Sequence, residues 1–245
     1  MDKFVYIGGI PRSGTVAVGV FIHFHEEAFV YQTTKGPPPQ HAKGNFLNAL
    51  RHRHTEGNYE PAQYLITKDR PPDFDDFNNF IEKKNKEWDA EKVFSRKIIG
   101  IREDEALPMF LPAKEHIKDR EVKLIFPMRM NLKDLIYSQL TRIILDHELP
   151  KKLEIFTSRM IKAYDQILEI KTEYPDDVLV VGITDSKDRK AEYLKICEFL
   201  DMEPNSFQKR WMDNVPVINS FSRVISKTIE QVSSHKFYQE MLKEL

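Results

Sequence analysis

The chain has little cysteine and no long apolar run. Cys197 is its only cysteine, so a disulfide within the chain is excluded and a reducing compartment is favoured. The longest apolar stretch, Val16–Ile22, contains Gly19 and falls far short of the roughly 20 residues that a membrane span needs. Residues Met1–Gly9 lack the basic start and the apolar length of a secretory signal. We therefore expect a cytoplasmic protein without a membrane partner.

An excess of charge of either sign is also missing. The 37 lysines and arginines are balanced by 38 aspartates and glutamates, for a net charge of −1. A protein that binds nucleic acid over a broad surface normally carries a basic excess, so this class is disfavoured. Hydrophobic residues make up 41% of the chain, which argues against disorder driven by charge. An anionic ligand must therefore be bound by a local cluster of positive groups.

Short apolar runs alternate with longer segments of helical period. The runs are Phe4–Ile7, Phe29–Tyr31, Tyr64–Thr67, Ile98–Ile101, Val122–Phe126 and Val178–Val181. The helical segments include Leu132–Asp146, Leu153–Thr172, Ala191–Leu200 and Val224–Leu245. This alternation predicts an α/β fold, with a central, mostly parallel sheet flanked by helices on both faces. The length fits a single domain over residues 1–245.

A glycine-rich turn, Gly8–Thr15, joins the first apolar run to a helical segment. In an open α/β sheet, ligands bind beyond the carboxyl ends of the strands, which is where this turn lies. Gly14 lets the backbone approach a ligand closely, and the hydroxyls of Ser13 and Thr15 lie beside the free N–H groups of the first helical turn. The turn therefore predicts an anion site, with a nucleotide phosphate as the ligand.

The turn differs from a Walker A loop. Gly9 and Gly14 have the G-x-x-x-x-G spacing, but Thr15 and Val16 follow where Lys and then Ser or Thr should stand. The lysine that contacts the β- and γ-phosphates is missing, and so is the hydroxyl that holds magnesium. An enzyme that hydrolyses ATP or GTP is disfavoured for these reasons. The positive charge lies inside the loop instead, at Arg12.

The segment Gly9–Thr15 resembles the 5′-phosphosulfate-binding loop of the sulfotransferases, in which a strand is followed by Pro, Lys or Arg, Ser, Gly, Thr or Ser, and a helix. The resemblance implies the three-layer, P-loop-like sulfotransferase fold. It also implies 3′-phosphoadenosine 5′-phosphosulfate (PAPS) as the donor, with no metal. The donor-binding positions that it implies here are Pro11, Arg12, Ser13, Gly14, Thr15 and Val16.

Two further segments, Val122–Arg129 and Asn131–Ser138, resemble the part of these enzymes that binds the 3′-phosphate of the donor. A strand ends in Arg129, whose planar guanidinium suits a phosphate, and a helix carries Ser138. Nine positions separate the two residues, one more than is usual in the family. Arg223 lies in a tail that often folds back over the nucleotide in this family, and it is a third candidate for the 3′-phosphate.

The implied reaction moves a sulfuryl group to an acceptor hydroxyl or amine by in-line displacement. Arg12 and the loop N–H groups are placed to stabilise the charge that grows on the leaving 5′-phosphate. A general base must take the acceptor proton, and Glu103, after the fourth apolar run, is the first candidate. Arg102-Glu103 resembles the Lys-Glu pair of many bacterial members. Glu105 and His41 are the alternative bases.

Three functions are compatible with these patterns. The leading one is a PAPS-dependent sulfotransferase that acts on a small-molecule or carbohydrate acceptor and releases adenosine 3′,5′-bisphosphate (PAP). The alternatives are a nucleotide kinase or NTPase with a degenerate Walker A loop, and a nucleotide-binding protein of the same fold without catalysis. Binding of PAP without magnesium separates the first two. The candidate cations Arg12, Arg129 and Arg223 converge only if strand ends meet along one edge of the sheet.

Overall fold

The apolar runs of the sequence form a central β-sheet. The computed structural model describes residues 1–10, 13–33, 59–61, 75–86, 90–102, 110–129, 135, 149–183, 188–214, 234 and 236. The strands in this part of the chain are β1 (Lys3–Ile7), β2 (Ala28–Thr33), β3 (Tyr59–Pro61), β4 (Ile98–Arg102), β5 (Glu121–Pro127) and β6 (Val178–Val181). Five of the six predicted strands are confirmed. The remaining one, Tyr64–Thr67, lies outside the described residues.

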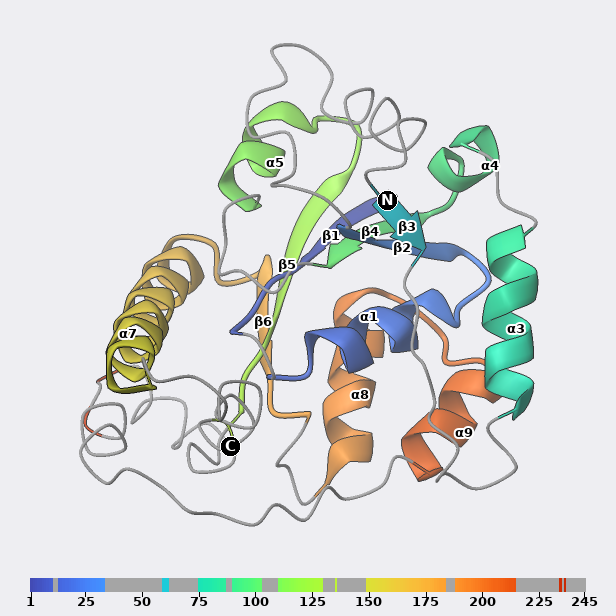
Figure 1. Ribbon diagram of the computed structural model, residues 1–245. Helices are drawn as coiled ribbons and strands as arrows, with labels where there is room; N and C mark the ends of the chain where they lie inside the picture. Colours follow the sequence, from blue (N-terminus) through green and yellow to red (C-terminus); the bar gives the residue numbers. More distant parts are fainter. Residues whose placement is uncertain are drawn as a thin grey trace.

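The sheet has the strand order β3-β2-β4-β1-β5-β6. Strand β1 pairs in parallel with β4 and β5, and the pairs β2–β4 and β5–β6 are also parallel. The short edge strand β3 runs antiparallel to β2. Figure 1 shows β1 in the middle of the sheet, between β4 and β5. In the order of the chain, β2 and β4 come first and lie on one side of β1, and β5 and β6 follow and lie on the other side.

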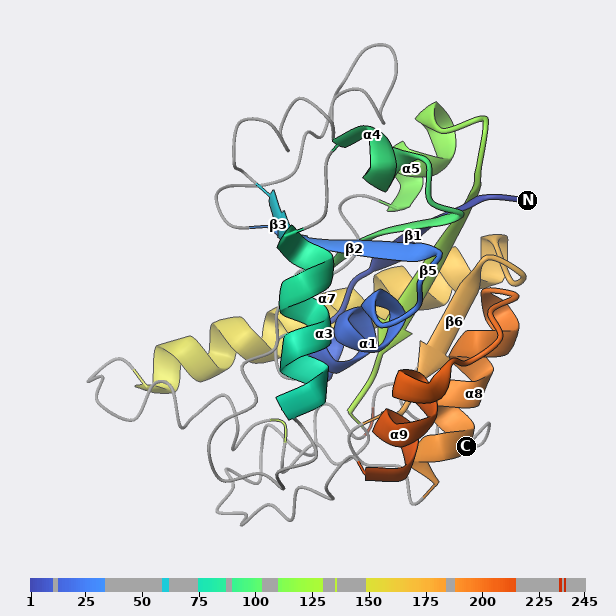
Figure 2. The same cartoon turned by 90° about the vertical axis from the view of Figure 1, so that its right-hand side faces the viewer.

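Helices cover both faces of the sheet, as the two views of Figures 1 and 2 show. One face is covered by α1 (Thr15–His23), α3 (Asp75–Lys86), α8 (Arg189–Phe199) and α9 (Ser206–Asn214). The other face is covered by α4 (Ala90–Phe94), α5 (Phe110–His116) and α7 (Leu149–Glu173). The predicted α/β architecture, a mostly parallel sheet between two layers of helices, is therefore confirmed.

The side chains of β1 explain why its sequence is apolar without alternation. Phe4 and Tyr6 belong to the hydrophobic core under α5 and α7, whereas Val5 and Ile7 belong to the core under α1 and α8. All four side chains are completely buried. A strand in the middle of a parallel sheet is buried on both faces, so it has no position for a polar side chain between its ends.

Two of the predicted helices match the structure closely. The segment Leu153–Thr172 lies inside α7, which starts earlier because Pro150 is tolerated in the first turn of a helix. Helix α8 covers most of the predicted segment Ala191–Leu200, and the side chain of Asp188 caps it by accepting the N–H of Ala191 at 2.9 Å. Of the other two predicted helices, Leu132–Asp146 and Val224–Leu245, only residues 135, 234 and 236 are described.

Candidate anion-binding site at the carboxyl edge

Strand β1 ends where the connections of the sheet change direction. We call the edge where the parallel strands end the carboxyl edge, and the opposite one the amino edge. The last residue of β1, Ile7, lies opposite Arg102 of β4 and Ile125 of β5. In open α/β sheets, the crevice at such a switch point is the usual place for a ligand. The glycine-rich turn of the sequence therefore lies at the position that the topology favours for binding.

The turn after β1 continues along the end of β5. The N–H of Gly8 donates to the carbonyl of Ile125 at 3.2 Å. A Cβ on Gly9 would lie 2.9 Å from Ser13 Oγ and 3.2 Å from the carbonyl oxygen of Pro127. The N–H of Ser13 then closes the turn on the carbonyl of Ile10 at 3.0 Å. Gly9 is required here because the loop, the helix start and strand β5 leave no room for a side chain.

Helix α1 begins at this turn without a capping side chain. Its N-cap, Gly14, has a φ of 110°, in the left-handed region that favours glycine, and no side chain caps the helix. The first turn carries no acidic residue. The N–H of Val18 makes a helical bond to Gly14 at 3.1 Å, so the N–H groups before it have no partner within the helix. Backbone N–H groups at such a helix start, together with the helix dipole, are suited to an anion.

The predicted loop residues that the structure describes lie at this helix start. Ser13 and Thr15 are 1% and 2% exposed, and Val16 is half-buried. Arg129 follows β5 at the same edge and is 5% exposed. The N–H of Met128 donates to the carbonyl of Val181 at 2.7 Å, which fixes the chain beside β6 just before the arginine. The topology thus brings the loop after β1 and Arg129 to the ends of neighbouring strands.

Arg102 ends β4 on the other side of β1. A Cβ on Gly19 of α1 would lie only 3.2 Å from its Cδ atom, so the aliphatic part of Arg102 lies directly against the helix. Sequence reasoning missed this contact. Its signal was Gly19 itself, because glycine is unfavourable inside a helix and often marks a close approach. Arg102 thereby connects the ends of β4 and β1 to the helix that starts at the candidate site.

The remaining predicted site residues lie outside the described part of the chain. They are Pro11, Arg12, His41, Glu103, Glu105, Ser138 and Arg223. In the sequence, Pro11 and Arg12 come between Ile10 and Ser13, and Glu103 directly follows Arg102. Their roles stay predictions.

One buried carboxylate near the site was not singled out by sequence reasoning. Glu192, in the first turn of α8, is 3% exposed. Its carboxylate accepts the N–H of Gly182 at 2.8 Å and the ammonium of Lys195 at 2.6 Å. The signal was its position, because Glu192 precedes the buried Ile196 by four residues and so lies on the apolar face of the helix.

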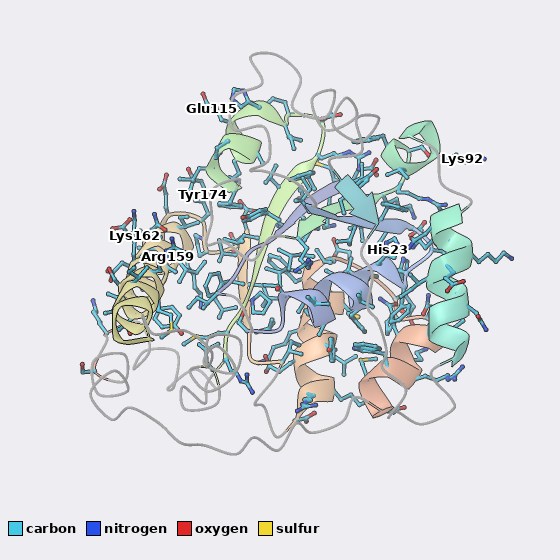
Figure 3. All side chains as sticks on the ribbon, in the orientation of Figure 1. His23, Lys92, Glu115, Arg159, Lys162 and Tyr174 are labelled. Atoms are coloured by element: carbon cyan, nitrogen blue, oxygen red, sulfur yellow. The ribbon has the colours of Figure 1, made fainter. Side chains whose placement is uncertain are left out.

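Large pKa shifts occur far from this edge. His23, at the end of α1, is completely buried, which lowers its pKa well below the ordinary value. Its Nδ1 accepts the N–H of Val30 at 3.1 Å, so the proton lies on Nε2, which donates to Asn85 Oδ1 at 3.0 Å. Figure 3 shows His23 between the central elements and α3. The neutral imidazole therefore connects β2 to α3 and belongs to the packing of the fold.

Two other kinds of site are absent from the described part of the chain. The described residues contain no group of three or more His, Cys, Asp or Glu side chains arranged to hold a metal ion. Within the same ranges, no helix combines the length and the apolar character of a membrane span.

Comparisons with known proteins add a likeness to solved structures. No family model matches the chain, and no curated protein matches its sequence. Among solved structures, the chain is similar to the sulfotransferase domain of the olefin synthase from Synechococcus PCC 7002. The similarity covers 98% of this chain and 94% of that chain, with 16% sequence identity and a TM-score of 0.49. A likeness of this degree concerns the overall course of the chain and carries no argument about activity.

Proposed function

We propose that the chain is a PAPS-dependent sulfotransferase. One observation carries the proposal: two features that suit anions lie on neighbouring strand ends of the carboxyl edge. The first is the start of α1 after β1, which has no capping side chain and no acidic residue in its first turn, and the second is the buried Arg129 after β5. Two such features favour a ligand with two separate phosphate groups, and PAPS carries one on each side of its ribose.

The residues at this edge fit such a donor. Gly9 has no space for a Cβ, because its backbone lies close to Ser13, Thr15 and the carbonyl of Pro127. The hydroxyls of Ser13 and Thr15 add donors for the 5′-phosphosulfate. For the 3′-phosphate, we propose Arg129, together with Ser138 and Arg223. A planar guanidinium on a buried backbone is well suited to a desolvated phosphate.

The donor supplies an activated sulfuryl group, and the chain supplies charge and a base. Arg12 and the loop N–H groups stabilise the leaving 5′-phosphate, which keeps the electron pair of the broken S–O bond. Glu103 takes the proton of the acceptor hydroxyl or amine as the new bond to sulfur forms, with Glu105 and His41 as alternative bases. Val16 offers no hydroxyl to magnesium, and no lysine follows Gly14, so this chemistry proceeds without the metal of a kinase.

Other parts of the proposal follow from the sequence. The acceptor is a small molecule or a carbohydrate, the enzyme acts in the cytoplasm, and residues 1–245 form a single catalytic domain. An acceptor panel incubated with labelled donor identifies the substrate class.

Binding of PAP tests the proposal directly. We expect the full chain to bind PAP in the absence of magnesium, measured by isothermal titration calorimetry. Arg129→Ala should weaken binding by about two orders of magnitude, because removing one partner of a buried charge pair costs ~2–5 kcal/mol. Arg159, an exposed arginine on α7, provides the matched control (Figure 3), and Arg159→Ala should bind PAP like the wild type.

Two outcomes would contradict the proposal. Tighter binding of ATP with magnesium than of PAP would favour a kinase or an NTPase. Equal loss of affinity in Arg129→Ala and Arg159→Ala would remove Arg129 from the site. Binding of PAP without transfer to any acceptor would instead support the non-catalytic nucleotide-binding protein.

A further inference from the structure

Glu192 is a buried carboxylate whose partners lie beside the candidate site. It belongs to the first turn of α8, and its neighbours Tyr193 and Ile196 on the helix are completely buried. One carboxylate oxygen accepts the N–H of Gly182 at 2.8 Å, and the other accepts Lys195 Nζ at 2.6 Å. Gly182 directly follows β6, the strand that pairs with β5.

The bond to Gly182 acts on a single peptide group. The N–H of Gly182 and the carbonyl of Val181 belong to the same planar unit, so the orientation of one fixes the other. The carbonyl accepts the N–H of Met128 at 2.7 Å, while the N–H donates to Glu192. A continuous series of bonds therefore leads from the carboxylate through this peptide to the residue that precedes Arg129.

Burying a carboxylate at this position is unfavourable unless its hydrogen bonds compensate for the loss of water. Removing a charge from water is unfavourable, and an apolar side chain would fill the same space more cheaply. In return, a charged acceptor makes a stronger bond to a backbone N–H than a neutral one, and it polarises the peptide that bonds to Met128. Glu192 thus holds the turn after β6 firmly against the end of β5.

We infer that Glu192 is a positioning residue for Arg129. By fixing the Val181–Gly182 peptide, it sets the backbone from which the Arg129 side chain reaches the 3′-phosphate. The inference deepens the proposed function and rests on it, because the 3′-phosphate is part of the proposed donor. Glu192 itself touches no ligand. Its effect is therefore confined to the part of the affinity that depends on the 3′-phosphate.

The ratio of two dissociation constants isolates this effect. PAP and adenosine 5′-monophosphate (AMP) share the adenosine and the 5′-phosphate, but only PAP carries the 3′-phosphate. We expect Glu192→Leu, which removes the acceptor of the Gly182 N–H, to lower the preference for PAP by about ten- to a hundredfold. Affinity for AMP should stay within about twofold of the wild type, because the loop after β1 is unchanged. Calorimetry with the full-length chain gives both constants.

Conservative and matched variants separate positioning from folding. Glu192→Gln keeps an oxygen that accepts the Gly182 N–H, so it should restore most of the preference for PAP. Lys195→Ala removes only the half-exposed partner, and Glu198→Gln changes an exposed carboxylate of the same helix. Both should bind PAP and AMP like the wild type. If Glu192→Leu does not fold, Glu192→Gln and Lys195→Ala still carry the test, because positioning requires both to keep the preference.

A double variant completes the test. In an Arg129→Ala background, Glu192→Leu should cause no further change in the ratio, because the side chain that it positions is gone. Equal weakening of PAP and AMP by Glu192→Leu, or a lower melting temperature with an unchanged ratio, would overturn the inference and leave a purely structural role. If the wild type shows no preference for PAP over AMP, the proposed function itself fails, and the two failures are thereby distinguished.

Discussion

The two edges of the parallel sheet use polar residues in opposite ways. At the amino edge, lysine and arginine side chains end on carboxylates and on backbone carbonyls of the chain itself. At the carboxyl edge, glycine, hydroxyl and N–H groups surround the start of α1, and the first turn of this helix carries no acidic residue. The cations at the amino edge therefore serve the fold, whereas Arg129 at the carboxyl edge is the cation that we propose for a ligand.

Lys3 illustrates the amino edge. Its side chain is 4% exposed, and its Nζ lies 2.7 Å from Asp201 Oδ2 and 3.6 Å from Glu121 Oε2. Arg120 behaves similarly, because its guanidinium donates to the carbonyls of Phe94 and Arg96 at the end of α4. These cations neutralise carboxylates or complete the last turn of a helix, where positive charge is favourable.

Lys84 is bonded to three backbone carbonyls. Its ammonium donates to the carbonyls of His23, His25 and Ala28, at 2.5 Å, 2.6 Å and 2.7 Å. These carbonyls belong to the end of α1 and to the turn that leads into β2, so Lys84 connects α3 to both elements. Burial, with a smaller contribution from Arg96, lowers the pKa of Lys84 to about 7.

The largest expected effect is a loss of affinity caused by a variant at the carboxyl edge. Gly9→Ala places a methyl group 2.9 Å from Ser13 Oγ and 3.2 Å from the Pro127 carbonyl, so the loop must move. We expect the affinity for PAP to fall by about a hundredfold, the cost that a 1 Å misplacement can carry. Calorimetric titration of the purified variant measures it.

Gly100→Ala is the matched control for this variant. Its methyl group would lie 3.0 Å from Val30 Cγ2, inside the sheet and away from the loop. Overpacking there should lower the free energy of unfolding by about 1–3 kcal/mol and leave the affinity for PAP unchanged. If both variants lose affinity only in proportion to their loss of stability, the carboxyl edge is no more specialised than the rest of the sheet.

The sequence predicts the strands of the sheet better than the partners of the charged side chains. Runs such as Phe4–Ile7 indicate buried strands, because a strand covered on both faces needs apolar residues at every position. The Pro127 carbonyl that leaves no room for a Cβ on Gly9 belongs to the neighbouring strand β5. The spacing of the glycines in the sequence therefore indicates a turn, but not how closely that turn packs. The partner of Lys3 is 198 positions away along the chain, and no local pattern can identify it.

The next largest expected effect is a loss of stability caused by a variant at the amino edge. Lys84→Met leaves three backbone carbonyls without their donor, so we expect a loss of about 1–3 kcal/mol of stability at neutral pH. The affinity for PAP should stay unchanged, because the loop after β1 is on the opposite edge. Urea unfolding, followed by circular dichroism, measures the first effect, and calorimetry measures the second.

The pH dependence of this variant has a defined sign. Between the folded pKa of about 7 and the ordinary value of Lys84, the unfolded chain binds a proton that the folded chain lacks. The stability of the wild type relative to Lys84→Met should therefore increase as the pH rises through this window, by at most about 1.4 kcal/mol per pH unit. A flat difference would show that the three carbonyls keep the ammonium charged in the folded state.

The smallest expected effect concerns Asp201, which lies at the amino edge beside Lys3. The residue follows α8 with a φ of 49°, and the bonds Asp201 N–H to Glu198 and Met202 N–H to Cys197 form a Schellman motif. An aspartate is tolerated in the left-handed region, and here its carboxylate also holds the buried ammonium of Lys3. Asp201 therefore combines a left-handed backbone, which glycine would adopt more easily, with an ion pair at the amino edge.

Three variants of Asp201 separate these two contributions. Asp201→Ala loses the ion pair and strains the backbone, so it should have the lowest urea midpoint. Asp201→Gly loses the pair but relaxes the backbone, and should lie close to the wild type. The hydrogen bond and the charge of Lys3 lower the pKa of Asp201, so the advantage over Asp201→Asn is present above the ordinary carboxylate pKa and is lost as the pH falls through the folded value. Because the carboxylate is exposed, screening should keep this advantage small. An unchanged affinity for PAP in all three variants would support the division between the edges, whereas a lower affinity would connect them.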